Sequence, residues 1–219
     1  MDQQILNLLL AGIGETLYMT LVSTVLAYVF GLPIGVILYI TDKGGICRMR
    51  PVNSVLGILV NLLRSVPFII LLMWLLPLTR AVVGTTVGST AVIVPLVIAA
   101  APFVARMVES SLKEVDKGVI EAAQSMGAGN LRIILSVILP EAKPSLVIGS
   151  TIAVTTILGY SAMAGFTGGG GLGAIAVNYG YYRYEDEIML VTVVLMVIIV
   201  QLFQEIGMRA AKRLDKRSK

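Results

Sequence analysis

The stretch TLYMTLVSTVLAYVFGLPIGVILYI, residues 16–40, contains no charged side chain. An α-helix rises about 1.5 Å per residue, so about 20 apolar residues are needed to cross a hydrocarbon core of about 30 Å. The stretch is long enough for that crossing. We therefore expect a membrane-spanning helix over residues 16–40.

Further apolar runs follow along the chain. They lie at residues 52–76, 81–105, 145–163 and 188–204, and Arg64 is the one charged residue within them. The fourth run continues without charge to Tyr182, which is too long for one crossing, and the glycines from Gly165 onward predict that the helix ends near Met163. The chain is 57% hydrophobic and 14% charged, against about 45–50% and about 25% in soluble proteins. These features predict an all-α polytopic membrane protein with five transmembrane helices.

The basic residues are concentrated on one predicted side of the membrane. The segments 41–51, 106–144 and 205–219 carry 14 of the 17 lysines and arginines. Cytoplasmic loops carry such an excess, so we expect the N-terminus outside and the C-terminus in the cytoplasm. The tail at residues 205–219 is expected to contact lipid headgroups and not nucleic acid.

The residue inventory excludes most enzyme chemistry. The chain has no histidine and one cysteine, Cys47, which excludes a zinc site of His and Cys, a Ser-His-Asp triad and a CxxC redox pair. No GxxxxGK[ST] motif occurs, and the glycine run at residues 168–173 follows a predicted membrane helix instead of a strand. We expect no enzyme activity, no catalytic residue, no metal and no cofactor.

The polar loop at residues 106–144 is longer than most helix connections, yet its composition is that of a folded segment. Asp116 is placed to cap a helix that Gly127 ends. Asn130 is placed to cap a second helix, residues 131–139, which Pro140 ends. The loop should therefore form two short helices on the cytoplasmic face.

The first of these helices has the composition of a docking surface. Ala122 and Ala123 keep it narrow, so another protein can approach closely, and Glu121 can meet a basic partner. The alternative is an amphipathic helix that rests on lipid. The residues by themselves leave both interpretations open.

At this loop the sequence resembles the membrane subunits of ABC importers, whose signature is EAA, three residues, G, nine residues, then I-x-L-P. The chain has Glu121-Ala122-Ala123, then Gly127, then Val137-Ile138-Leu139-Pro140, with Val137 as the one departure. The stretches at residues 64–72, 101–109 and 159–163 are similar to the permeases of methionine importers. The resemblance covers about residues 12–204, which implies one transmembrane domain followed by the tail.

The resemblance implies a function and partners. Two copies of the chain would form the pathway for D- and L-methionine. Two cytoplasmic ATP-binding subunits would couple to the loop through Glu121, Ala122, Ala123, Gly127, Leu139 and Pro140, and an external substrate-binding lipoprotein would deliver the substrate. The location implied is the inner membrane of a bacterium.

A permease for another amino acid of the same family is an alternative. An ion-coupled transporter is a weaker one, because Arg64 has no carboxylate at its depth and no internal repeat is found.

Four residues within the spans are candidates for the pathway or its gate: Arg64, Tyr160, Ser161 and Met163. Arg64 is expected near mid-bilayer, where it either lines the pathway or pairs with carbonyls that Pro67 frees. Met163 ends a row with Thr155 and Gly159 that either packs against another helix or forms a gate of flexible thioether side chains. The tyrosines and acidic residues at 179–187 belong to the interfacial belt or receive the binding protein.

Overall fold

A computed structural model describes residues 3–214, and all regular structure within that range is helical. The α-helices are α1 (Gln3–Thr41), α2 (Arg50–Ser65), α3 (Phe68–Trp74), α4 (Leu76–Val83), α5 (Ser89–Lys113), α6 (Lys117–Ser125), α7 (Asn130–Ile133), α8 (Leu139–Glu141), α9 (Lys143–Met163), α10 (Gly171–Ile175) and α11 (Asp186–Leu214). Two π-helical segments, η1 (Ile134–Ile138) and η3 (Ala176–Tyr181), and one 3₁₀ segment, η2 (Ala164–Thr167), connect them. The all-α prediction is confirmed. Of the basic tail, Lys216, Arg217 and Lys219 lie outside the described residues.

Within residues 3–214, four helices are long and apolar enough to cross a membrane by themselves. They are α1, α5, α9 with its η2 extension, and α11. Helices α2 and α3 pass the same test only together, as a pair bent by 98°. Five spans are therefore present if the bent pair is one of them.

The predicted span at residues 52–76 is not one continuous helix. Helix α2 ends at Ser65, Val66 is extended with ψ 125°, and α3 begins after Pro67. The proline ring disfavours helical backbone at the residue before it, and proline has no amide to donate to the preceding turn. The chain therefore turns at Val66 and Pro67.

Glycines shift the next predicted span. Gly84, with φ +84°, caps the C-terminus of α4, and Gly88 has φ +98° directly before α5. Such backbone is easy only for glycine. The helix therefore runs over Ser89–Lys113 instead of residues 81–105, and its last two turns form the start of the segment 106–144.

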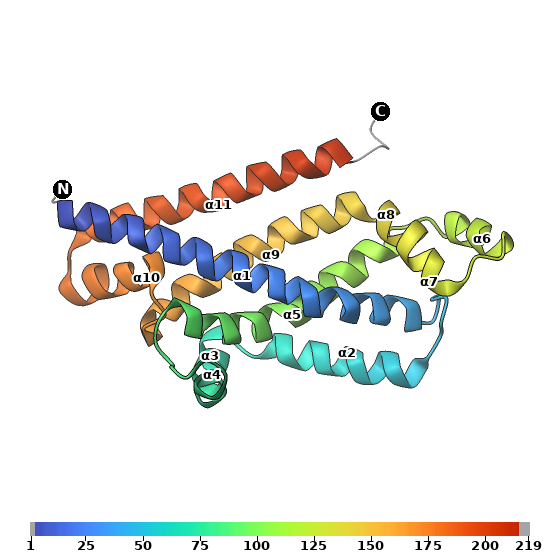
Figure 1. The fold of residues 1–219 in the computed structure, drawn as a ribbon, viewed down its shortest axis with the longest axis horizontal. Coiled ribbons are helices and arrows are strands. Elements are labelled where there is room, and N and C mark those ends of the chain that lie inside the picture. Colours follow the sequence, from blue (N-terminus) through green and yellow to red (C-terminus); the bar gives the residue numbers. More distant parts are fainter. Residues whose placement is uncertain (1–2, 215–219) are drawn as a thin grey trace.

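Figure 1 shows the long helices side by side along the longest axis of the molecule. Helix α1 begins at the left-hand end in that view, and α6 and α7 lie at the right-hand end with the turn between α1 and α2. Helices α3, α4 and α10 lie toward the opposite end. The loop that the sequence marks for a partner is thus confined to one end of the bundle.

Helix α1 packs along α5 through two glycines one turn apart. A Cβ atom at Gly31 would lie 2.7 Å from the Ala101 carbonyl oxygen, and one at Gly35 would lie 2.6 Å from the Ala105 carbonyl oxygen. Small residues at this spacing allow two membrane helices to approach until their backbones touch. The crossing holds α1 on the helix that leads to α6.

Candidate functional site

Helix α6 has the ends that the sequence predicts. The Asp116 carboxylate accepts a hydrogen bond from the Gly118 amide at 2.6 Å. Gly127 has φ +76°, and its amide and that of Ala128 donate to the Gln124 and Ala123 carbonyl oxygens. A glycine in the left-handed region with two such bonds is a Schellman end. The prediction of a short, capped helix is confirmed.

The two alanines of α6 face opposite ways. Ile120 and Ala123 are 7% and 4% exposed and belong to the main core cluster, whereas Glu121, Ala122 and Met126 are exposed. Residues three apart share one face of a helix, so Ile120 and Ala123 point inward together. The expectation that Ala123 is part of the outward surface is therefore wrong, and Ala122 with Glu121 forms that surface.

The second half of the loop differs from its prediction. Asn130 is the first residue of α7 and donates through Nδ2 to the Cys47 sulfur at 3.0 Å, instead of capping the helix. The helix widens into the π-helical segment η1 and continues past Pro140, which stands in the first turn of α8. Proline has no amide to donate to the preceding turn, and here that turn is already distorted into the π-helical segment. Leu139 is half-buried and Pro140 exposed.

A cavity of about 530 Å³ opens beside α6. It is lined by the end of α1 and the turn after it, the end of α5, the connection between α5 and α6, and one side of α6: Tyr39, Asp42, Gly44, Gly45, Ile46, Lys113, Val115, Lys117, Ile120, Glu121 and Gln124. The space separates the turn after α1 from α6. The described chain thus leaves α6 uncovered on the side of Glu121 and Gln124.

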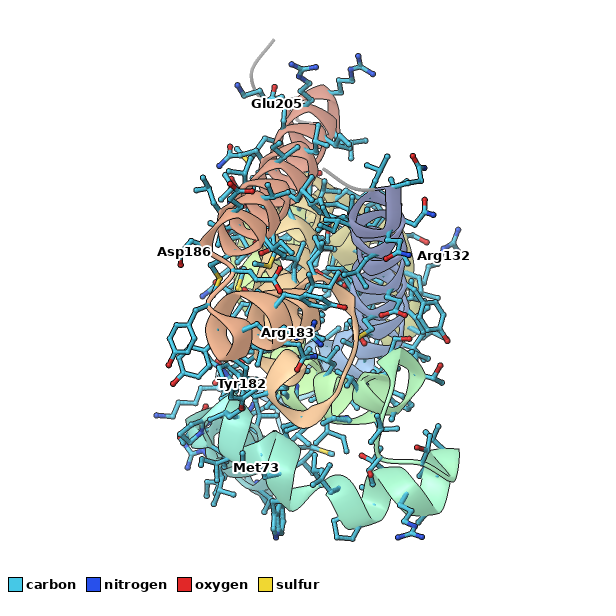
Figure 2. The ribbon with its side chains drawn as sticks, turned by 90° about the vertical axis from the view of Figure 1, so that its left-hand side faces the viewer. Met73, Arg132, Tyr182, Arg183, Asp186 and Glu205 are labelled. Atoms are coloured by element: carbon cyan, nitrogen blue, oxygen red, sulfur yellow. The ribbon has the colours of Figure 1, made fainter. Side chains whose placement is uncertain are left out.

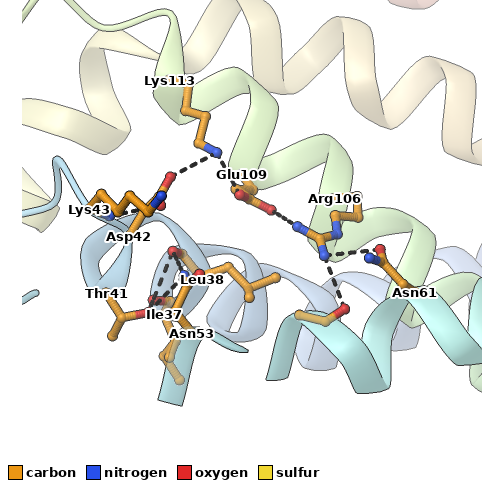
Figure 3. A network of polar contacts seen from close by, with 11 residues as sticks. Ile37, Leu38, Thr41, Asp42, Lys43, Asn53, Asn61, Arg106, Glu109 and Lys113 are labelled. Atoms are coloured by element: carbon orange, nitrogen blue, oxygen red, sulfur yellow. Dashed lines mark hydrogen bonds and ion pairs between the residues drawn. The ribbon is translucent and has the colours of Figure 1, made fainter. Parts of the chain in front are cut away.

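Charged side chains of α5 connect it to α2 and to the turn after α1 at this end, as Figure 3 shows. Glu109 is 6% exposed and accepts hydrogen bonds from Arg106 at 2.6 Å and from Lys113 at 2.7 Å. Lys113 lies 3.1 Å from the carboxylate of Asp42, and Arg106 donates to Asn61 at 2.9 Å. The sequence prediction does not include this cluster, although residues 106, 109 and 113 lie on one helix face by their spacing.

Asp42 and Lys113 stabilise each other's charged forms. The Lys43 amide, followed by the Lys113 ammonium, holds the pKa of the Asp42 carboxyl below its usual value. The Lys113 ammonium lies 3.1 Å from that carboxylate and 2.7 Å from the carboxylate of Glu109. The Asp42 carboxyl is therefore ionised at neutral pH and pairs with the ammonium.

Arg64 lies in the last turn of α2, directly before the break, and is exposed. Its guanidinium carbon lies 6.0 Å from the centroid of the Phe103 ring of α5. No hydrogen bond to a carbonyl near Pro67 is found among residues 3–214, so the pairing with freed carbonyls does not occur. Arg64 instead lies over the Phe103 ring and is otherwise exposed.

The candidate gate residues on α9 have different environments. The Tyr160 ring stacks on Phe68 with centroids 4.6 Å apart, and the buried Ser161 hydroxyl donates to the Leu158 carbonyl. Met163 is 47% exposed, and a Cβ at Gly159 would meet no atom within 4 Å. The described chain therefore leaves the face of α9 with Gly159 and Met163 uncovered. Tyr160 and Ser161, in contrast, pack against other residues of the same chain.

Figure 2 looks at the opposite end of the molecule, where Tyr182, Arg183 and Asp186 lie near the start of α11. Here α1 anchors α10: the Glu15 carboxylate accepts from the Gly171 amide at 2.6 Å and the Thr16 hydroxyl accepts from the Leu172 amide at 2.9 Å. The guanidinium of Arg183 lies 4.3 Å from the Tyr179 ring centroid. Glycines in the turn before α10 allow the side chains of α1 to approach the backbone of α10 this closely.

The family model and the curated relatives that match this chain all indicate one family of transport proteins. The family model of the binding-protein-dependent transport system inner membrane component matches residues 31–219. A probable D-methionine transport system permease protein MetI of Vibrio cholerae is 49% identical over 211 residues, which cover 96% of this chain and 94% of that protein. The D-methionine transport system permease protein MetI of Escherichia coli K12 is 49% identical over 165 residues, 75% of this chain and 76% of that protein.

Solved structures agree with these relatives. A chain of the inward-facing MetNI methionine ABC transporter superposes with a TM-score of 0.97 at 47% identity, covering 99% of this chain and 100% of that one. A chain of an amino acid ABC transporter with histidines shares the fold at a TM-score of 0.79 and 20% identity, covering 96% and 95%.

Proposed function

The chain belongs to the family of binding-protein-dependent transport system inner membrane components, and we propose that it is the permease subunit of an ATP-driven importer of D- and L-methionine. It is a multi-pass protein of the inner membrane. Its relatives are named as permeases and not as ATPases. The energy for transport therefore comes from a separate subunit that this chain must contact.

The observation that carries the proposal is the outward surface of α6. Glu121 and Ala122 are exposed at one end of the bundle, while Ile120 and Ala123 fix the same helix to the core. A small outward residue permits close approach, and a rigid inward face passes a push on the helix to the rest of the chain. This surface is the docking site for the ATP-binding subunit, with Gly127, Leu139 and Pro140 setting the shape of its border.

The assembly proposed contains two copies of the chain, two ATP-binding subunits and an external binding protein. The uncovered face of α9 with Gly159 and Met163 faces the pathway between the copies. The end with α6 lies in the cytoplasm, and the start of α1 lies outside, where the binding protein docks. The excess of basic residues around α6 supports this orientation.

Transport follows alternating access. Closure of the ATP-binding subunits draws the two α6 helices together, and the helix bundles rotate so that the pathway opens outward. The chain itself moves no proton and forms no bond. Its contribution is a helix bundle with two stable arrangements, biased by the nucleotide state of its partner.

The experiment is uptake of labelled methionine by cells that lack their own methionine importers. Cells that express this chain with its ATP-binding subunit and binding protein should accumulate D- and L-methionine, and an excess of another amino acid should not compete. Cells with the same three proteins but Glu121→Lys in this chain are the control for coupling through α6. Competition by an unrelated amino acid at equal strength would contradict methionine as the substrate.

A further inference from the structure

Helix α2 is attached to the bundle at two places. Near its start, Asn53 donates to two residues of α1, the Leu38 carbonyl at 2.7 Å and the Thr41 hydroxyl at 3.2 Å, and its second half is held by α5. Val60 is its one buried residue, so little apolar packing holds it. Two residues of α5 reach it there: Arg106 Nη2 donates to Asn61 at 2.9 Å and to the Gly57 carbonyl at 3.1 Å, and Phe103 lies under Arg64. The position of the second half of α2 therefore depends on where α5 places Arg106.

Arg106 is fixed from its other side by Glu109. Its Nη1 donates to the Glu109 carboxylate at 2.6 Å, while Nη2 bonds α2. The guanidinium is a flat fork that can hold two partners at once in one orientation. Its Nε is buried and has no partner within the described residues, so the two Nη groups alone set the orientation.

The same stretch of α5 leads directly into α6. Glu114, Val115 and Asp116 separate the two helices, and Leu112 and Val115 belong to one core cluster with Ile120 and Ala123 of α6. Packed cores pass on displacement because they cannot be compressed. A movement of α6 therefore moves the end of α5 and the charged side chains on it.

The start of α3, directly after α2, contacts the helix of the candidate gate residues. Beyond the break at Pro67, Phe68 stacks on Tyr160 of α9. A tilt of α2 shifts Phe68 against α9, the helix whose other face is uncovered. One connected route thus runs from α6 through Arg106 and α2 to α9.

We propose that the Arg106–Glu109 pair and Asn61 are positioning residues that transmit the movement of α6 to α2, and so couple ATP hydrolysis to opening of the pathway. This inference rests on the proposed function. The residues touch neither nucleotide nor substrate. Their role is to make α2 follow α5 when the ATP-binding subunit displaces α6.

Substitutions at Asn61 test the link without disturbing the core, because this side chain is exposed. Asn61→Leu removes the shorter of the two hydrogen bonds that Arg106 makes to α2 and leaves the Gly57 carbonyl as its acceptor there, whereas Asn61→Asp retains an acceptor oxygen. Ser54→Leu is the matched control, because Ser54 is exposed on the same helix and makes no hydrogen bond in the part of the chain described. The quantity measured is the number of ATP molecules hydrolysed per methionine imported by the reconstituted complex.

Asn61→Leu should raise that ratio about fivefold, within the range found for residues that connect distant sites, with a normal yield of assembled complex. Asn61→Asp and Ser54→Leu should leave it near the wild-type value. Arg106→Lys keeps the charge but cannot hold two partners as the fork does, and should raise the ratio like Asn61→Leu. Equal ratios in all variants, or loss of assembly in Asn61→Leu alone, would overturn the proposal. Absence of ATP-dependent uptake in the wild type would instead contradict the proposed function.

Discussion

The crossing of α1 and α5 gives the clearest prediction of stability. An alanine at Gly35 would place its Cβ 2.6 Å from the Ala105 carbonyl oxygen and 2.7 Å from Val108 Cβ. Carbon atoms pack well at about 3.5–4.0 Å, so the two helices must separate or shift. Overpacking of this kind costs about 1–3 kcal/mol.

The matched control is Gly14→Ala on the same helix. A Cβ there meets no atom within 4 Å. Both substitutions gain the same helix propensity, roughly 1 kcal/mol, so the difference between the two variants isolates the clash at Gly35. The α1–α5 crossing is therefore tested without interference from the intrinsic preference of the helix.

The assay is thermal unfolding of the purified chain in detergent, followed with a thiol-reactive dye at Cys47, the one cysteine. For a chain of this size about 1 kcal/mol shifts the midpoint by about 2–4 °C. Gly35→Ala should therefore melt roughly 2–12 °C below Gly14→Ala. If the two variants melt together, α1 does not lie against the backbone of α5 at this crossing.

Three further outcomes concern the end of the bundle that carries α6. In the assembled importer, Ala122→Cys should cross-link to the ATP-binding subunit and Ala123→Cys should not, because Ala123 is buried; the reverse pattern would contradict the geometry of α6. Gly127→Val should reduce uptake and lower the free energy of unfolding by about 1–2 kcal/mol, since a side chain is strained at φ +76°. Gly127→Asn should retain uptake. Asp42 has a lowered pKa, so the stability it supplies is present above its ordinary value of 3.8 and is lost as the pH falls through the lowered value. Asp42→Asn should therefore melt below wild type at pH 7, with a free energy of unfolding lower by at most about 1 kcal/mol because the pair with Lys113 is partly exposed. In acid the melting points of the two proteins should converge.

The sequence predicts the helices well and their breaks poorly. Apolar runs indicate α1, α9 and α11 because crossing a membrane requires length and hydrophobicity alone. The presence of a proline does not by itself predict a bend. Pro33, Pro95 and Pro102 lie within continuous helices, whereas Pro67 stands at the 98° bend. Neighbouring helices decide which proline breaks a span, and no local pattern contains that information.

The candidate site shows the same division. Local capping rules place both ends of α6 correctly, because Asp116 and Gly127 act within one turn of the chain. The spacing of Ile120 and Ala123 already indicates a shared face, so the burial of Ala123 follows from periodicity. The link between Arg106 and Asn61 joins residues 45 positions apart, and only the packing of α2 on α5 reveals it.

The central claim is that this chain imports methionine with energy from ATP. It is tested most directly in proteoliposomes that contain the chain with its ATP-binding subunit, with the binding protein and labelled D-methionine on one side and ATP on the side of α6. We predict accumulation of methionine that requires ATP hydrolysis and is unaffected when proton and sodium gradients are collapsed. Accumulation without ATP that disappears with the ion gradient would contradict the account.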